Sequence, residues 1–168
     1  MRRLLDGLYS ASAWLAGISM ILVLVMVMAT ILSRFFGFAI HGTDSYAGYA
    51  MAGAGFFALA STLKHGEHIR VTLLLGMLKG KALKGLEVLA LLVATALSAF
   101  LAYYSIRLVW QSWEINDISM GLDATPLWIP QLVMALGTVI FFIAFCDELV
   151  LELLGRREDR EPKDAHHE

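Results

Sequence analysis

The side chains that could carry redox chemistry lie outside the long apolar stretches of this sequence. Its histidines, which could ligate a haem iron or another metal, are His41, His65, His68, His166 and His167. A haem held within a membrane needs histidines that face one another from neighbouring apolar helices. No histidine falls in an apolar stretch, so the sequence predicts no cofactor and no bound metal.

Nucleophiles and carboxylates are also poorly placed for chemistry. Ser19, Ser61 and Ser98 lie in apolar stretches, but a serine nucleophile there needs a His or Lys at a similar depth. Every Asp and Glu lies at the end of an apolar stretch or beyond it. Transporters that move a proton or a solute through their own core usually keep ionisable groups inside their spans. We therefore expect a chain that is not an enzyme.

The apolar stretches themselves predict the fold. The chain has 168 residues, of which 58% are hydrophobic and 17% charged, against about 25% charged in a soluble domain. Four stretches of 27, 19, 19 and 23 residues lack Asp, Glu, Lys and Arg, at 7–33, 45–63, 88–106 and 124–146. Crossing a bilayer takes about 20 mostly apolar residues in a helix. The sequence predicts an all-α integral membrane protein with four transmembrane helices.

The predicted spans lie within one membrane domain, residues 1–154. We place them at residues 11–33, 45–63, 86–108 and 126–147. The third helix is expected to be longer than the membrane, because residues 82–113 contain no proline. The fourth is expected to begin near Pro126, since proline is favoured in a first helical turn.

Two segments outside the spans carry predictions of their own. Val71, Leu74, Leu75 and Leu78 recur at helical spacing, which favours a short interfacial helix between the second and third spans. The alternative is that this segment continues into the third helix. Residues 155–168 are charged and have no apolar face, so we expect a disordered cytoplasmic tail.

The distribution of basic residues predicts the orientation. The N-terminal segment, the 64–84 loop and the tail hold all Lys and Arg except Arg34 and Arg107. Positive charge favours the cytoplasmic side, so both termini are expected there. Tryptophans favour the headgroup region, and three flank the loop between the third and fourth spans on the other side: Trp110, Trp113 and Trp128.

Small residues predict where helices approach one another. They recur every four residues in the second span, at Ala50, Ala54 and Ala58. The third span repeats the pattern at Ala90, Ala94 and Ser98. Such rows let helix backbones come close in lipid. We expect the second and third spans to pack on each other, the alternative being generic alanine richness.

Three segments carry a resemblance to a known family. The loop after the second span reads Lys64-His65-Gly66-Glu67-His68-Ile69-Arg70-Val71-Thr72-Leu73-Leu74. The first span ends in Ser33-Arg34-Phe35-Phe36-Gly37, and the entry to the fourth runs from Ser119 through Pro126-Leu127-Trp128-Ile129-Pro130. Over about residues 1–155 this resembles the small membrane subunit of tripartite ATP-independent periplasmic (TRAP) transporters.

The resemblance implies a division of labour. A large multi-span subunit would carry the sodium and substrate sites, and a periplasmic binding protein would deliver the substrate, usually an organic acid. The small subunit would brace the scaffold of the large one in the bacterial inner membrane, within a secondary, ion-gradient-driven transporter. It would also help to dock the binding protein.

Candidate contacts with partners or lipids follow from this comparison. They are Arg34, Asp44, Glu67, His68, Arg70, Arg107, Trp110 and Trp128. Glu67, His68 and Arg70 would form a cytoplasmic structural knot, the alternative being a solvated basic loop. The sequence departs from the family pattern at Thr72, where an acidic residue is common, and around Asp44, where a Trp and a Glu are common.

Two other functions compete with this reading. One is a membrane anchor or assembly subunit of a respiratory or redox complex, against which the position of the histidines argues. The other is an autonomous small exporter, against which the missing mid-membrane carboxylate argues.

Overall fold

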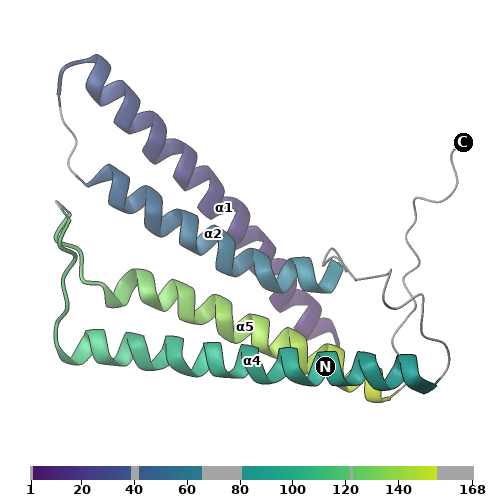
Figure 1. The fold of residues 1–168 in the computed structure, drawn as a ribbon. Helices are drawn as coiled ribbons and strands as arrows, with labels where there is room; N and C mark the ends of the chain where they lie inside the picture. Colours follow the sequence, from purple (N-terminus) through teal and green to yellow (C-terminus); the bar gives the residue numbers. More distant parts are fainter. Residues whose placement is uncertain (1, 39–41, 66–80, 122, 155–168) are drawn as a thin grey trace, which may run out of the picture.

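The computed structural model describes residues 2–38, 42–65, 81–121 and 123–154. Within these ranges the chain forms four helices: α1 (Arg2–Phe35), α2 (Thr43–His65), α4 (Lys81–Glu114) and α5 (Trp128–Leu153). Figure 1 shows them as an open, all-helical arrangement. The predicted interfacial helix and the predicted disordered tail lie outside the described residues.

Three of the helices are long and apolar enough to cross a membrane. They are Leu5–Phe35 of α1, Gly85–Glu114 of α4 and Trp128–Leu153 of α5. α2 has 23 residues, but its Gly, Ser, Thr and Tyr residues lower its hydropathy. The all-helical fold is confirmed, whereas membrane crossing by α2 stays a prediction.

Helix ends follow the local sequence. α4 is continuous over 34 residues, roughly 51 Å at about 1.5 Å per residue, as the absence of proline predicted. α5 begins at Trp128, two residues after Pro126 and so near it as predicted, and Pro126 itself forms an isolated antiparallel bridge with Ile118. An extended residue cannot open a helix, so the first helical residue comes later.

The four helices pair as two hairpins lying side by side. α1 packs along α2, α4 packs along α5, and the hairpins meet where α2 packs along α5. α1 touches α5 only over a short length. The predicted packing of the second span on the third is wrong, because within the described chain α2 has no extended contact with α4. Figure 1 shows α5 lying between them.

Glycines allow α2 and α5 to come close. A Cβ atom at Gly137 of α5 would lie 2.7 Å from Cβ of Phe56 and 2.9 Å from its carbonyl carbon. A Cβ at Gly53 of α2 would lie 3.1 Å from Cγ1 of Val133 and 3.2 Å from Oγ of Ser19 on α1. Close backbone approach at small residues is how helices associate in lipid, so these glycines join the two hairpins.

α4 presents a narrow seam of mostly small residues to α5. Leu91, Ser98, Ser105 and Ser112 recur every seven residues, and all four are buried, as is Ala102. A seven-residue repeat keeps one face of a helix against a neighbouring helix when the two wind slightly around each other, as in a coiled coil. The seam uses one side of α4, and no other described helix covers the opposite side.

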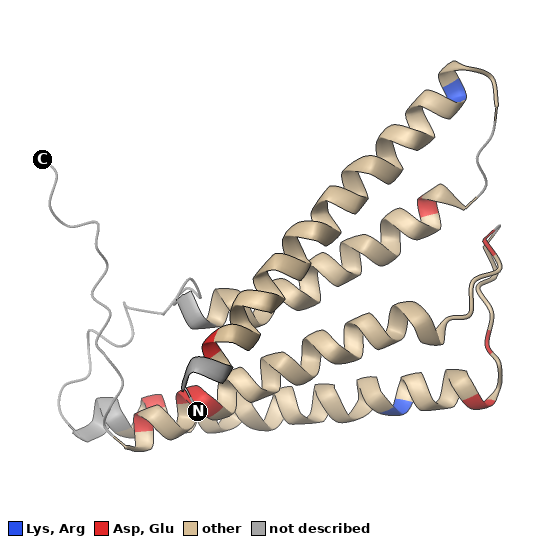
Figure 2. Ribbon diagram, turned by 180° about the vertical axis from the view of Figure 1, so that it is seen from behind, with Lys and Arg blue, Asp and Glu red and all other residues tan. Residues whose placement is uncertain are grey.

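A second cluster holds α1 against the rest of the fold. Buried Tyr9 packs with Ala60 and Ala144, which joins α1, α2 and α5 at one end. Nearby, the hydroxyl of Ser12 donates a hydrogen bond to the carbonyl of Phe57. Figure 2 shows the charges of the described residues lying toward the two ends of the helices. The middle of the fold is therefore held by packing rather than by ion pairs.

Candidate interaction surface

The connection between α4 and α5 folds into a small hairpin. Ile118 and Pro126 form its bridge. The Ser119 N–H donates to the Thr125 carbonyl at 2.9 Å, and the Leu127 N–H donates to the Asp117 carbonyl at 3.0 Å. The described residues of this connection therefore form a hydrogen-bonded platform at one end of the fold.

Asp123 fastens this hairpin to α2. The Tyr49 hydroxyl donates to Asp123 Oδ2 at 3.1 Å, and the Ser119 hydroxyl donates to Oδ1 at 2.9 Å. Hydrogen bonds from the side chains of Thr125, Ser119 and Tyr49 lower the pKa of Asp123 from its ordinary 3.8 to about 2, because they favour the ionised form. We call Tyr49, Ser119, Asp123 and Thr125 the aspartate clip.

Gly42 makes room for the clip at the start of α2. Its φ of +83° is a conformation that side chains with a Cβ rarely adopt. A Cβ there would also lie 2.9 Å from Cβ of Asp123. The backbone before α2 and the hairpin after α4 are thus in contact, although 81 positions separate them in the chain.

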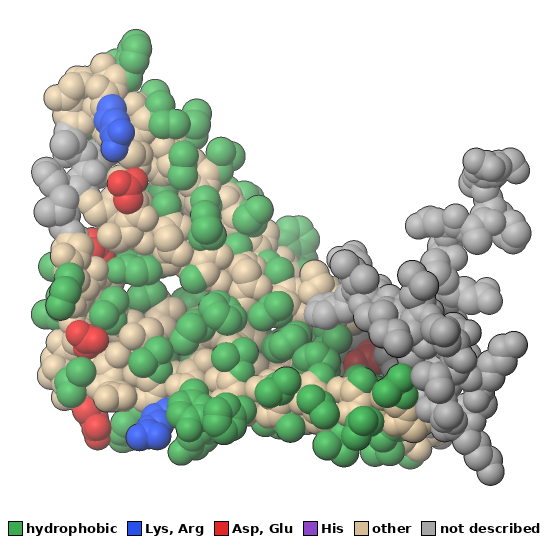
Figure 3. Space-filling model, in the orientation of Figure 1, with side chains coloured by type: hydrophobic (Ala, Val, Ile, Leu, Met, Phe, Trp, Pro, Cys, Tyr) green, Lys and Arg blue, Asp and Glu red, His purple; other side chains and the backbone are tan. Residues whose placement is uncertain are grey.

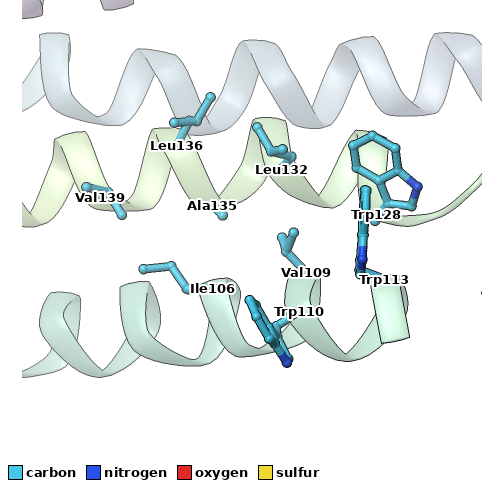
Figure 4. A pocket seen from close by; sticks show the side chains of 9 residues that line it. All are labelled: Ile106, Val109, Trp110, Trp113, Trp128, Leu132, Ala135, Leu136 and Val139. Atoms are coloured by element: carbon cyan, nitrogen blue, oxygen red, sulfur yellow. The ribbon is translucent and has the colours of Figure 1, made fainter. Parts of the chain in front are cut away.

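An apolar groove of about 530 Å³ opens between α4 and α5 close to the same end. Its lining comes from both helices: Ile106, Val109, Trp110, Trp113, Trp128, Leu132, Ala135, Leu136 and Val139. The rings of Trp113 and Trp128 meet edge to face, with centroids 4.9 Å apart. Figure 4 shows this pair at one end of the groove and Val139 toward the other. The groove can accept an apolar group and offers no acid–base chemistry.

The structure places the predicted contact residues on separate surfaces. Arg34 is exposed in the last turn of α1, and Asp44 is exposed in the first turn of α2. Arg107 and Trp110 are exposed on α4, and Trp128 is half-buried at the groove. The other predicted contacts, Glu67, His68 and Arg70, lie outside the described residues.

The predicted packing residues differ in burial. Ala54 and Ser98 are buried, and Ala50, Ala58 and Ala94 are half-buried. Ala90 is exposed. The row on α2 therefore faces α1 and α5 in part, while on α4 the burial follows the seven-residue seam and leaves Ala90 outside it.

Sequence reasoning missed the aspartate clip. The sequence placed Asp123 only as a charge at the end of an apolar stretch, and it predicted no contact between Asp123 and Tyr49. The local signal was the turn-forming run from Ser119 to Thr125, since Ser, Gly and Asp favour tight turns. Nothing in that run indicates that Tyr49 would be its partner, because the contact arises from the packing of α2 on α5.

Comparison with known families gives one match to this chain. The model of the family described as tripartite ATP-independent periplasmic transporters, DctQ component, matches residues 23–155. No curated protein matches the chain. The matched range includes all of α2, α4 and α5, the aspartate clip and the groove.

Proposed function

The chain belongs to the family of DctQ components of tripartite ATP-independent periplasmic transporters, and on that premise we propose that it is the small accessory membrane subunit of a secondary transporter for organic acids. In this proposal an ion gradient, carried by sodium, drives uptake through a large membrane subunit. The present chain braces the scaffold of that subunit. The observation that carries the proposal is the family match over residues 23–155.

The proposed role is structural rather than catalytic. The family is one of transporter components and not of enzymes, in agreement with the sequence prediction. The apolar helices and the close helix contacts at Gly53 and Gly137 favour a rigid, structural role for the chain. The alternative of an anchor for a respiratory complex is not favoured by the family match.

The proposed topology has four spans in the bacterial inner membrane. α2 crosses with the other three helices, and its low hydropathy is offset because α1 and α5 cover part of its surface. Both termini are cytoplasmic, as the basic residues of the 64–84 loop and the tail predict. The clip and the groove then lie at the periplasmic end.

The clip is suited to helping the binding protein dock. It holds the α4–α5 hairpin firmly on α2, and that hairpin presents two apolar side chains to solvent, Ile118 and Met120. An ordered platform loses little conformational entropy when a partner binds. Arg34 and Asp44, exposed at the same end, supply charges for the rim of such a contact.

The test is reconstitution of the transporter with and without this chain. The chain, the large subunit and the binding protein from the same transporter are purified, and uptake of organic acids into vesicles is measured under a sodium gradient. We expect the chain to co-purify with the large subunit, and we expect uptake to fall strongly when it is omitted. Full uptake without the chain, or a chain that never co-purifies, would refute the proposal.

A further inference from the structure

One side of α4 is not covered by any other helix that the structure describes. Opposite the seam with α5 lies a surface that we call the aromatic face of α4: Phe100, Tyr103, Tyr104, Arg107 and Trp110. The exposed fractions of Phe100, Tyr103 and Trp110 are 63%, 61% and 67%. Figure 3 shows hydrophobic side chains gathered along α4, which runs along the bottom of that view, with a basic side chain among them.

The aromatic face carries polar groups that have no partner among the described residues. The rings of Tyr103 and Tyr104 meet edge to face, with centroids 5.4 Å apart, and Tyr104 also contacts the Phe100 ring at 4.6 Å. No hydrogen bond or ion pair joins the two phenol groups or the Arg107 guanidinium to any residue within the described ranges. Tyrosine hydroxyls usually find a hydrogen-bond partner where they are shielded from water.

These polar groups lie deep in the membrane, where a missing hydrogen-bond partner is energetically unfavourable. Trp113 and Trp128, which touch, mark the headgroup level at this end of the fold. Arg107 is six residues further into α4 and Tyr103 is ten, about 9 Å and about 15 Å along the helix axis. The hydrocarbon core is about 30 Å thick, so Tyr103 lies inside it. A polar group without a partner is strongly unfavourable in hydrocarbon.

The exposed side of α1 provides the contrast. Its large exposed side chains between residues 18 and 32 are aliphatic or thioether groups, such as Met20, Ile21 and Leu24. Lipid tails satisfy such a surface fully. They satisfy the apolar parts of the aromatic face of α4 as well, but they offer no acceptor for two phenols and a guanidinium.

We propose that the aromatic face of α4 is the surface on which this chain meets the large membrane subunit of its transporter. A helix of that subunit covers Phe100, Tyr103 and Trp110 and places a carboxylate opposite Arg107. Its hydroxyl or carbonyl oxygens accept hydrogen bonds from Tyr103 and Tyr104. This inference rests on the proposed function, because it takes the partner from there.

Charge and composition favour a protein over a lipid. A lipid phosphate can reach Arg107, since long basic side chains extend toward the headgroups, but it cannot descend to Tyr103. Trp, Tyr and Arg are also the residues that contribute most to protein interfaces. Trp110 lines the apolar groove as well, so the groove continues this surface and offers a recess for one bulky apolar side chain of the partner helix.

Photo-crosslinking in the native membrane tests the contact. The variant Tyr103→p-benzoylphenylalanine keeps an aromatic ring at an exposed position, and Leu24→p-benzoylphenylalanine is the matched control on α1, with 62% of Leu24 exposed. We expect Tyr103 to crosslink to the large subunit at several times the yield of Leu24. Crosslinking of Tyr103 to lipid alone, or equal yields from the two sites, overturns the inference.

A charge variant gives an independent measurement. Arg107→Gln should weaken the complex with the large subunit about thirtyfold or more, because it leaves a buried carboxylate unpaired. Asp6→Asn, which also removes one exposed charge but from the first turns of α1, should leave the affinity unchanged. An unaltered affinity for Arg107→Gln, in a variant whose thermal unfolding matches the unmodified protein, overturns the inference. If the unmodified chain does not bind the large subunit at all, it is the proposed function that fails.

Discussion

At the scale of single residues, Asp123 controls how the α4–α5 hairpin is held on α2. Its lowered pKa, about 2 in the fold against an ordinary 3.8, gives the clip a definite pH dependence. A carboxyl group whose pKa is depressed by folding contributes stability that is complete above the unfolded pKa. That contribution declines as the pH falls from about 4 to about 2 and is absent below this range.

The Asp123→Asn variant should therefore lose stability only where the carboxylate is ionised. We expect a lower thermal unfolding midpoint for the variant at about pH 5, and nearly equal midpoints for both proteins at about pH 2. Thermal unfolding in detergent over this pH range measures the difference. Two curves that run parallel across the whole range would show that the charge of Asp123 does not hold the clip.

At Gly137, α5 lies so close to α2 that there is no room for a Cβ atom. Gly137→Ala places a methyl group 2.7 Å from Cβ of Phe56, so the helices must move apart. We expect a loss of about 1–3 kcal/mol in the free energy of unfolding, the usual cost of overpacking. Urea or thermal unfolding in detergent measures it.

Gly55→Ala is the matched control on α2. Nothing lies within 4 Å of a Cβ at this position, so the added methyl group meets open space. Alanine is favoured over glycine inside a helix by about 0.5–1 kcal/mol, and this variant should be neutral or more stable. Equal losses in the two variants would mean that α2 and α5 do not approach as closely as Gly137 indicates.

At the scale of the helices, the α4 seam depends on small side chains at seven-residue spacing. Ser105→Leu inserts a large side chain where the serine is only 4% exposed. It should destabilise the isolated protein by about 1–3 kcal/mol. Ala90→Leu, a similar enlargement at an exposed position of the same helix, should change stability by no more than about 0.5 kcal/mol. A large loss for Ala90→Leu and little change for Ser105→Leu would mean that α5 packs on the side of α4 that carries Ala90.

The positions of the helices could be predicted from the sequence, but which helices pack against each other could not. Uncharged runs and the lack of proline between residues 82 and 113 fix where an apolar helix can exist. Rows such as Ala50, Ala54 and Ala58 show that a face is small, but they do not say which helix it meets. α2 carries small residues all round, so its pairing with α1 and α5 is decided by the whole assembly.

Single residues of the interaction surface could be predicted from the sequence, but contacts between distant segments could not. Trp110 and Trp128 stand out as headgroup aromatics, and both line the groove. The clip joins Tyr49 to Asp123 across 74 positions. No periodicity within one segment reports a contact of that kind, since it exists only once the two hairpins have packed together.

At the scale of the whole molecule, the open prediction is that α2 crosses the membrane. In a Cys146→Ala background, Phe38→Cys should react with an impermeant maleimide added from the periplasmic side. Gly76→Cys should react only after the membrane is opened. Phe38 lies just beyond α1, and position 76 lies between α2 and α4. Labelling of both cysteines from one side would mean that α2 does not cross.

The pairing of helices that are neighbours in the chain has a consequence for how the protein is made. α1 and α2 emerge from the ribosome in succession, so they can enter the bilayer and pair before α4 and α5 have been synthesised. The second hairpin can form on its own in the same way. Biogenesis then ends in one lateral joining step within the lipid, the meeting of α2 and α5. Until that step is complete, the sides of α2 and α5 that carry Gly53 and Gly137 face lipid instead of each other. A membrane quality-control protease would then act on two separate hairpins that have not yet assembled.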